Sequence, residues 1–415
     1  MVNTFYDSYR ILMHVYSEKS FIKQAINSEI IEPINKSTVI KIVYGVVEND
    51  IQLEYILSKL CSKRPKLPVR VLLKIAIYCI KFLNKAPYAV TDSAVELCKK
   101  LGKGGMSGFL NATLRAYIKN PNFEFPKDEK QALSIKYSYP LFAVNELVKD
   151  YGVQTASEIM GCDKDYNYLR FTNSVNGEEY LSSNNVVFET TPFVNCFSVK
   201  NFTREDGYYD GKYTFQSIGS VAICSLIEKG DNLLDCCAGP GGKTVFLAEK
   251  FNKVIASEVH QHRANLIKEY AERMNAKNIT VVCEDSTIFN SEYSQVFDTI
   301  LCDAPCSGFG VVKENPDIKL NREETNLFQL NKLQLSILNN VCKYLKKGGN
   351  LYYSTCSVFK QENDGIIKKF LSLNKDFTVE KISSPLEHLP TEFGLQFLPN
   401  ISLGAGFYVC KMRKL

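Results

Sequence analysis

The sequence of 415 residues contains no tryptophan, only four histidines and no Cys-x-x-Cys pair. Structural zinc sites usually combine closely spaced cysteines and histidines, so the sequence predicts no metal site. Without tryptophan, any aromatic stacking surface must be built from tyrosine and phenylalanine. The sequence also has no internal repeat and no low-complexity tract, which argues against a repeat protein.

Long apolar runs are missing as well. The best candidate for a membrane span, residues 69–83, includes Arg70, Lys74 and Lys81, so it predicts a helix of a water-soluble protein. The first residues lack the pattern of a secretory leader, and we expect the protein in the cytoplasm. Because the cytosol is reducing, the fourteen cysteines are predicted to be free thiols.

Charge is distributed unevenly along the chain. Residues 1–125 contain 18 Lys and Arg against 10 Asp and Glu, a net charge of +8, so the rest carries −3 of the total of +5. Basic runs such as Lys63–Lys66 and Lys99–Lys103 are suited to neutralise the phosphates of a nucleic acid. The alternative is an ordinary solvated helix face.

The basic part has the apolar spacing of helices. This spacing covers residues 11–25, 40–60, 69–83, 89–101 and 109–118. Two prolines between Pro121 and Lys127 then mark a boundary. We expect an all-helical domain at 1–125, a small α+β domain at 126–205 and a larger α/β domain at 206–415. Within the small domain, we predict a helix at 141–151 and strands at 168–171 and 186–188.

A glycine-rich turn, Asp235–Lys243, opens the third region. It follows the apolar pair Leu233 and Leu234 and precedes an uninterrupted stretch, Thr244–Lys250, so it predicts a strand, a tight turn and a helix. Glycines let the backbone approach a ligand closely, and helix N-termini favour polar or anionic groups. A nucleoside-binding turn is one interpretation, and an ordinary loop is the other.

Acidic residues at the ends of the next apolar runs favour the first interpretation. Glu258 follows residues 254–256 at the spacing of an acid that binds ribose hydroxyls, Asp285 ends the run 279–285, and Asp303 follows 297–302. With a further run at 350–354, this pattern predicts a doubly wound α/β sheet whose ligands bind at the carboxyl ends of the strands. An intervening helix is predicted at 326–347, with an apolar stripe of Leu330, Leu333, Ile337, Val341 and Leu345.

Four motifs carry a resemblance to a known family: Cys237–Thr244, Asp303–Gly308, Asn315–Lys319 and Tyr353–Ser357. They resemble those of the RNA cytosine-C5 methyltransferases, and more narrowly the RsmB family, also called Sun or Fmu. Residues 10–120 are similar to the NusB-like RNA-binding domain of that family. The resemblance implies a Rossmann-like doubly wound methyltransferase domain, preceded by an all-helical NusB-like domain and a small α+β domain in which Arg170 is a candidate RNA contact.

The same resemblance assigns the site. It implies S-adenosylmethionine as cofactor, Cys356 as nucleophile, Cys306 as its partner and Asp303 as a catalytic acid. Gln216 and Ser217, which match the entry to the catalytic domain, receive a supporting role. Cofactor contacts are assigned to Cys237, Ala238, Gly239, Pro240, Gly241, Gly242, Lys243, Glu258, Asp285 and Asp303.

The chemistry explains the need for two thiols. Carbon 5 of cytosine is a poor nucleophile, and addition of a thiolate to carbon 6 activates it. Proton donation near ring nitrogen 3, the edge assigned to Asp303, offsets the developing charge. After methyl transfer, Cys306 or a nearby water removes the proton from carbon 5. A neighbouring cation, for which Lys243 is a candidate, favours the reactive thiolate. Attack by Cys306, as in DNA cytosine methyltransferases, is the alternative.

The function implied is methylation of carbon 5 of one cytosine in 16S ribosomal RNA, before or during small-subunit assembly, by a monomeric enzyme. Alternatives are another RNA target (transfer RNA or 23S RNA), a non-catalytic RNA-binding assembly or antitermination factor, and a small-molecule methyltransferase. Three positions depart from the family pattern: Gly239 replaces the usual alanine, Glu258 replaces the commoner aspartate, and Ala405 stands where an acid is common.

Overall fold

A computed structural model describes residues 1–163, 167–200, 202 and 204–415. The chain forms two compact units, one of residues 1–160 and 312–322, the other of residues 161–311 and 323–415. Within these described residues, no helix is both long and apolar enough to cross a membrane.

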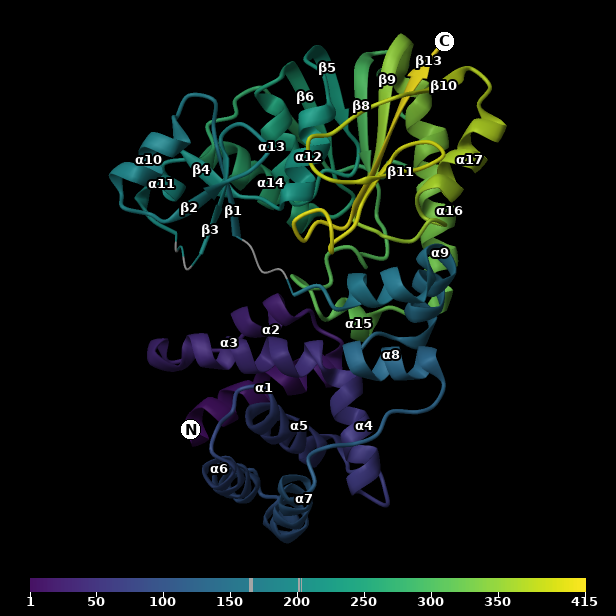
Figure 1. The fold of residues 1–415 in the computed structure, drawn as a ribbon. Helices are drawn as coiled ribbons and strands as arrows, with labels where there is room; N and C mark the ends of the chain where they lie inside the picture. Colours follow the sequence, from purple (N-terminus) through teal and green to yellow (C-terminus); the bar gives the residue numbers. More distant parts are fainter. Residues whose placement is uncertain (164–166, 201, 203) are drawn as a thin grey trace. The chain divides into compact units, whose positions relative to one another are not determined.

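The first unit is helical (Figure 1). Its apolar core is formed by residues that recur at helical spacing, such as Ile11, Val43, Leu72 and Leu114, all fully buried. Its helices are α1 Val2–Glu18, α2 Ile22–Asn27, α3 Pro33–Glu48, α4 Asp50–Leu60, α5 Leu67–Lys81, α6 Pro87–Lys100, η1 Gly104–Met106, α7 Ser107–Lys119, α8 Glu129–Tyr137, α9 Leu141–Met160 and α15 Ile318–Asn321.

The prediction of helices is confirmed, but two of the predicted segments are interrupted. A left-handed residue, Lys19 (φ 54°), ends α1, and Asn49 lies between α3 and α4 with a φ of −105° and a ψ of 20°. The apolar spacing continues across both interruptions because the helices on either side face one core. The helix predicted at 141–151 extends to Met160, with a non-helical Gly152 (φ 79°, ψ 167°) inside it.

Residues 312–322 belong to this helical unit, although the residues on either side of them in the chain, 161–311 and 323–415, form the second unit. The Ile22 amide donates to Asp317 Oδ2 at 3.3 Å. Lys319 is buried and donates through Nζ to the carbonyl oxygens of Glu48 (3.2 Å) and Tyr137 (3.0 Å). Burial lowers the pKa of Lys319 to about 8, although Glu48 opposes the shift. The motif Asn315–Lys319 thus forms part of the helical unit.

The second unit contains a small sheet in the order β2-β3-β1-β4, whose strand pairs are antiparallel. The predicted strand at 168–171 is confirmed, and the one predicted at 186–188 begins two residues later. Its elements are β1 Asn167–Phe171, α10 Gly177–Ser183, β2 Phe188–Thr190, β3 Cys196–Val199, α11 Asp206–Tyr209 and β4 Tyr213–Phe215.

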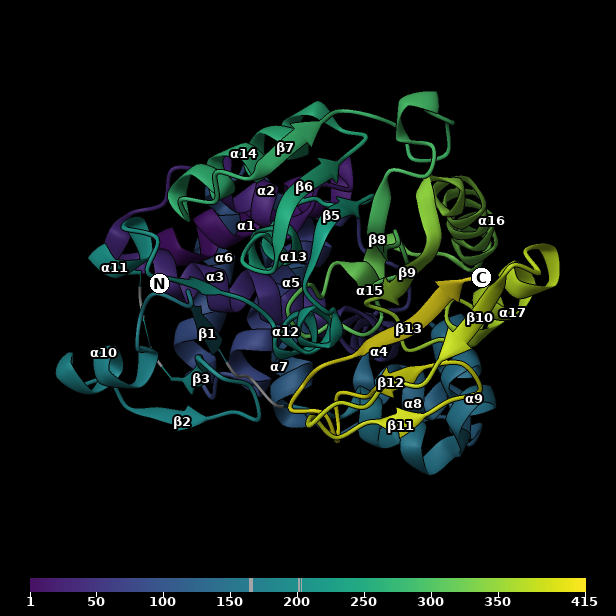
Figure 2. The same cartoon turned by 90° about the horizontal axis from the view of Figure 1, so that it is seen from above.

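A nine-stranded sheet forms the rest of this unit, in the order β11-β12-β13-β9-β8-β5-β6-β7, with β10 paired to β13 (Figure 2). Neighbours from β7 to β9 are parallel, and β13 is antiparallel to β9. Chain order reverses at β5, which places a ligand crevice at its carboxyl end. The strands are β5 Gly230–Asp235, β6 Phe251–Ser257, β7 Ile279–Val282, β8 Phe297–Asp303, β9 Leu345–Thr355, β10 Phe377–Glu380, β11 Leu389–Pro390, β12 Leu395–Phe397 and β13 Phe407–Lys414.

Helices cover both faces of this sheet. Leu233 packs in one core with residues of α12, whereas its neighbour Leu234 packs in another with residues of α16 and α17, as the two-residue period of a strand requires. The predicted doubly wound α/β fold is confirmed. The helices are α12 Ile218–Leu226, α13 Gly242–Ala248, α14 Gln261–Arg273, η2 Ser291–Tyr293, α16 Glu324–Val341, η3 Cys342–Tyr344 and α17 Asp364–Leu373.

The helix predicted at 326–347 was too long. Helix α16 ends at Val341, and Leu345 begins β9, where it pairs with Phe297. The predicted apolar stripe was also partly wrong, because Leu333 is 38% exposed whereas the polar Gln334 is fully buried.

The predicted boundary at residue 125/126 falls inside the first compact unit. Segment 120–128 packs on its helices, where the Tyr55 hydroxyl donates to the Glu124 carbonyl at 2.6 Å and the Tyr55 and Phe125 rings lie 6.5 Å apart. The small sheet shares the second unit with the large one. The division into three domains, at 125/126 and 205/206, stays a prediction.

Candidate active site

The predicted site residues lie at or just beyond the carboxyl ends of β5, β6, β7, β8 and β9. The glycine-rich turn joins β5 to α13, as the sequence predicted. Two backbone bonds shape it: Ala238 N donates to Ser257 O at 2.9 Å, and Gly241 N donates to Ala238 O at 2.7 Å. Gly241 has a φ of 105°, a conformation that favours glycine. The Gly239–Pro240 peptide is cis.

Glu258 lies directly against this turn. Its side chain is 4% exposed, and Oε1 accepts from the His260 amide at 3.0 Å while Oε2 lies 3.4 Å from Arg263 Nη1. Arg263 also donates through Nη2 to the Gly239 carbonyl at 2.6 Å. The acid expected to bind ribose is therefore next to the turn that it would serve.

Two departures from the family pattern belong together. A Cβ on Gly239 would lie 2.2 Å from Glu258 Oε2 and 2.8 Å from Arg263 Nε. An alanine at 239 would thus require the ends of the Glu258 and Arg263 side chains to shift. The glycine makes room for Glu258, rather than only freeing the loop.

Lys243 and Asp303 form an ion pair in the centre of the site. Lys243 Nζ lies 2.7 Å from Asp303 Oδ2, and the Ser354 hydroxyl donates to Asp303 Oδ1, also at 2.7 Å. Burial opposes the charge on Lys243, but Asp303 and, less strongly, Cys356 raise its pKa above the ordinary value. The Lys243 ammonium is therefore charged and within electrostatic reach of Cys356.

The two predicted catalytic cysteines are in contact. Cys306 follows β8, Cys356 follows β9, and their Sγ atoms lie 3.2 Å apart. Cys306 is 8% exposed, whereas Cys356 is half-buried. A hydrogen bond to Cys356 and burial raise the pKa of Cys306 well above its ordinary value. The raised pKa favours the protonated form of Cys306, and Cys356 is the more exposed of the two residues.

Two other acids differ in their surroundings. Asp285 is exposed and accepts from the Thr287 amide (2.8 Å) and hydroxyl (2.7 Å), so it closes its own turn three residues beyond β7. Asp235, at the end of β5, is buried and accepts from the Thr244 hydroxyl at 2.7 Å. Burial raises the pKa of Asp235 to about 7.

Arg170 does not have the position of an RNA contact. Its side chain is buried. The guanidinium donates through Nε to Gln216 Oε1 (2.8 Å) and through Nη1 to Glu249 Oε1 (2.7 Å). Gln216 in turn donates to the Gly242 carbonyl at 3.0 Å. The arginine thus links the small sheet to the start of α13, and a buried, paired guanidinium cannot bind phosphate. The supporting role predicted for Gln216 agrees with this contact.

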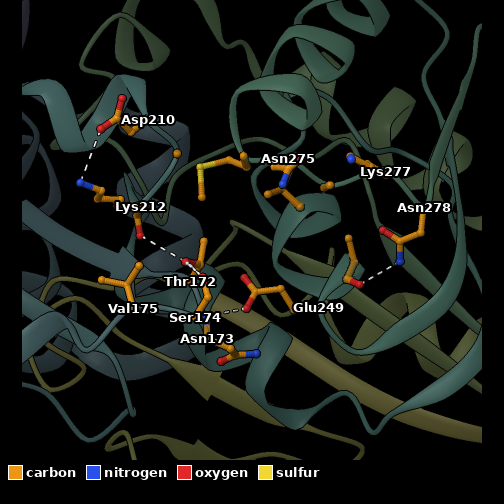
Figure 3. Close-up of a pocket in the computed structure, with 15 residues that line it drawn as sticks. Thr172, Asn173, Ser174, Val175, Asp210, Lys212, Glu249, Asn275, Lys277 and Asn278 are labelled. Atoms are coloured by element: carbon orange, nitrogen blue, oxygen red, sulfur yellow. Dashed lines mark hydrogen bonds and ion pairs between the residues drawn. The ribbon is translucent and has the colours of Figure 1, made fainter.

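A polar pocket of about 470 Å³ lies beside this arginine cluster, between the small sheet and the region of α13 and α14 (Figure 3). The backbone amide of Asn173 donates to Glu249 Oε2 at 2.9 Å, and the Lys212 ammonium lies 3.5 Å from the Asp210 carboxylate. None of the residues that line it is a predicted site residue. It is separate from the cysteine pair.

The sequence analysis missed the support beneath the cysteines. Gly310 N donates to Cys356 O at 3.0 Å, and the Gly310 backbone lies so close to Gly406 that a Cβ on Gly406 would be 2.3 Å from Gly310 Cα. The segment Gly404–Phe407 therefore supports the Cys306 loop from below. Ala405 is buried in an apolar core, an environment unsuited to an acid.

Comparison with known proteins agrees with both parts of the chain. Residues 223–413 match the family model described as 16S rRNA methyltransferase RsmB/F, and residues 8–119 match that of the NusB family. The Probable ribosomal RNA small subunit methyltransferase B of Bacillus subtilis (strain 168) is 29% identical over 95% of this chain and 94% of its own length. The ribosomal RNA small subunit methyltransferase B of Pasteurella multocida (strain Pm70) is 29% identical over 90% of this chain and 87% of its own length.

A solved structure has the same fold. The crystal structure of PH0851 aligns with a TM-score of 0.83 at 21% identity, over 100% of this chain and 98% of that one. The NusB match lies within the helical unit, and the RsmB/F match covers nearly all of the nine-stranded sheet and its helices together with residues 312–322 of the helical unit. The chain is therefore similar to the RsmB/F rRNA methyltransferases over residues 223–413 and to the NusB family over residues 8–119.

Proposed function

We propose that this protein methylates carbon 5 of one cytosine in 16S ribosomal RNA through a covalent adduct of Cys356 with carbon 6. The observation that carries the proposal is the pair of sulfurs, 3.2 Å apart, beside the Lys243–Asp303 ion pair. A nucleophile, a second thiol and a cation are thus gathered at the carboxyl ends of neighbouring parallel strands, where such sheets bind their ligands.

The turn after β5 suits S-adenosylmethionine. A Cβ on Gly242 would make only an ordinary van der Waals contact, at 3.8 Å from Gln216 Nε2, and Glu258 lies against the same turn. We assign the cofactor to the residues from Cys237 to Lys243 together with Glu258, Asp285 and Asp303. When bound, S-adenosylmethionine supplies an electrophilic methyl group.

Cys356 is the proposed nucleophile. It is the more exposed of the two sulfurs, and the charged Lys243 favours a negative charge on it. The two sulfurs are within hydrogen-bond distance, and the raised pKa of Cys306 favours its protonated form. Nucleophilic attack by Cys306, the alternative, would require the more deeply buried sulfur with the raised pKa to ionise first.

The remaining residues have assigned roles in the same cycle. Cys356 adds to carbon 6 and leaves carbon 5 enamine-like, and Asp303 contacts the edge of the base near nitrogen 3. After methylation, either Cys306 in its deprotonated form or a water beside it removes the proton from carbon 5. The carbon 6–sulfur bond then breaks, the electron pair returns to Cys356, and the aromatic ring is restored.

The helical unit supplies candidate contacts to RNA. The exposed basic residues of residues 63–66 and 99–103 are suited to bind phosphates, an interaction that weakens with salt. The family description supports 16S RNA as the target, in loops or incompletely folded regions where extruding the base costs only about a few kcal/mol.

The test is formation of 5-methylcytidine on unmethylated naked 16S RNA with S-adenosylmethionine, measured by nucleoside mass spectrometry. We expect product with the wild type, none with Cys356→Ala, and a covalent protein–RNA complex on denaturing gels with Cys306→Ala. Cys283→Ala, which removes an exposed cysteine elsewhere in the same unit, is the matched control. Normal activity of Cys356→Ala would reverse the assignment of the two thiols. Product on transfer RNA or 23S RNA alone would change the target.

A further inference from the structure

A buried glutamate lies behind the two cysteines. Glu362 is 0% exposed and six residues beyond Cys356 in the chain. Its Oε1 accepts from the Ser307 amide at 2.8 Å and from Gln334 Nε2 at 3.1 Å. Its Oε2 accepts from the hydroxyls of Ser307 and Ser357, each at 2.5 Å. The carboxylate is thus held by four neutral donors.

The donors come from both cysteine loops. Ser307 directly follows Cys306, and Ser357 directly follows Cys356. The two serine hydroxyl oxygens lie 3.2 Å apart, the same separation as the two sulfurs. The Cys306-Ser307 and Cys356-Ser357 dipeptides therefore lie side by side. Their sulfurs contact each other, and their serine hydroxyls bind the same carboxylate.

A third element ties this arrangement to α16. Gln334 donates through Nε2 both to Glu362 and to the Pro305 carbonyl (3.0 Å), one residue before Cys306. The Tyr353 hydroxyl donates to the Glu362 carbonyl at 2.6 Å. Glu362 is thus bound directly to Ser307 and Ser357 and is linked to the Pro305 carbonyl through Gln334.

We propose that Glu362 is a positioning residue that fixes the two cysteine loops relative to each other and so holds the two sulfurs in contact. The proposal rests on the proposed function for the roles of the thiols. Glu362 acts on the sulfurs through Ser307 and Ser357, whose hydroxyls it binds.

Stability alone does not explain a carboxylate at this place. Burying a charge away from water is costly unless it is fully hydrogen-bonded, and apolar groups of similar volume often do as well or better. Glu362 also contributes to the raised pKa of Cys306, after the larger effects of the hydrogen bond to Cys356 and of burial. Its charge thereby favours a proton on Cys306.

The test compares Glu362→Gln with the wild type. A glutamine keeps the size but offers one acceptor oxygen and no charge, so either the two serine hydroxyls or the Ser307 amide and Gln334 lose their acceptor. We expect kcat for RNA methylation to fall about 10²-fold, the effect of a small displacement of reacting groups, with the KM for RNA and the affinity for S-adenosylmethionine within about twofold of wild type. Glu380→Gln, which changes a partly exposed glutamate on β10, is the matched control.

A second readout does not depend on RNA. Iodoacetamide labelling of the free enzyme, followed by mass spectrometry of the two cysteine peptides, measures the preference for Cys356 over Cys306. We expect this preference to fall at least about fivefold in Glu362→Gln, because the loops are no longer held and the charge is gone. This labelling tests Glu362 even where the wild type makes no 5-methylcytidine, which would instead refute the proposed function.

A third variant guards against misfolding. Ser357→Ala removes one donor and leaves the other contacts, and we expect an intermediate loss of kcat of about tenfold with normal folding. The proposal is overturned by a folded Glu362→Gln enzyme with wild-type kcat. It is equally overturned if Glu362→Gln and Ser357→Ala lose stability and activity together while the labelling preference stays at the wild-type value.

Discussion

The two sides of the candidate site are held by different kinds of interaction. On the cofactor side, each ion pair joins a less exposed group to one that is more open to solvent, since Glu258 is 4% and Arg263 41% exposed, and Lys243 is 13% and Asp303 26% exposed. On the cysteine side, Glu362 and Asn363 are buried and are held by uncharged donors and acceptors.

The difference follows from what each side has to do. A ligand can exchange partners with an exposed ion pair, because such a pair is worth little in water and costs little to open. A buried network with every group paired resists displacement, because each lost partner leaves a desolvated polar atom. One side is thus suited to admit a molecule, and the other to keep two sulfurs in place.

The largest expected effect comes from breaking the cysteine side at Asn363. This side chain accepts from the Thr355 hydroxyl (2.6 Å) and donates to Ser357 O (3.1 Å) and Gln396 Oε1 (2.7 Å). Asn363→Leu leaves the Thr355 hydroxyl without its acceptor and Gln396 Oε1 without its donor, whereas Ser357 O keeps Gln396 Nε2 as a donor at 3.3 Å, so the free energy of unfolding should fall by about 3–5 kcal/mol. Denaturant unfolding measures it, with the exposed Asn184→Leu as control. A loss below about 1 kcal/mol would mean that the network tolerates gaps.

A second experiment concerns Asp235, a buried acid that has fewer hydrogen-bond donors than Glu362. Asp235 has one donor, the Thr244 hydroxyl, and within the described residues its Oδ1 has none. Because burial raises its pKa to about 7, the folded state holds a proton that the unfolded state has released above pH 4. Stability should therefore decrease as pH rises from about 4 to about 7, by about 1.4 kcal/mol per pH unit.

Asp235→Asn cannot ionise and isolates this contribution. The difference in unfolding free energy between wild type and Asp235→Asn should change across the window from pH 4 to 7 and stay constant above it. A difference that is constant from pH 4 to 8 would contradict the raised pKa of Asp235.

A smaller effect is expected on the cofactor side, at Gly239. An alanine there must displace Glu258, so Gly239→Ala should weaken binding of S-adenosylmethionine about tenfold. Glu258→Asp shortens the acid by one methylene and should restore binding in the double variant. Calorimetric titration of the four proteins gives the coupling energy. Simple additivity of the two changes would show that the glycine and the glutamate are independent.

The smallest effect is expected at Arg263. Its ion pair with Glu258 is solvent-exposed at the arginine, so Arg263→Met should change the free energy of unfolding by less than about 1 kcal/mol. Denaturant unfolding at low and high salt measures this. A loss as large as that of Asn363→Leu would remove the contrast between the two sides.

Much of this architecture can be predicted from the sequence. The doubly wound sheet, the turn after β5 and the proximity of Cys306 to Cys356 follow from apolar runs, from a glycine-rich motif and from the family resemblance. These features are local or repeat with the period of a strand, so the pattern of residues reveals them.

Features that depend on tertiary contacts could not be predicted. Glu362 and Gln334 have the appearance of surface residues in the sequence, because nothing local distinguishes a buried polar side chain from an exposed one. Arg170 looked like a basic RNA contact for the same reason. The end of α16 was misplaced because pairing of Leu345 with Phe297, some fifty residues earlier, competes with helix continuation.

The return of residues 312–322 to the helical unit bears on how the protein is made. Residues 1–160 leave the ribosome first, but the segment that completes their unit follows roughly 160 residues later. At elongation rates of about 5–20 residues per second, roughly ten to thirty seconds separate the two events. During that interval the carbonyl groups of Glu48 and Tyr137 lack the hydrogen bonds that Lys319 later donates to them. The N-terminal unit therefore reaches its final form only after most of the catalytic sequence has been translated.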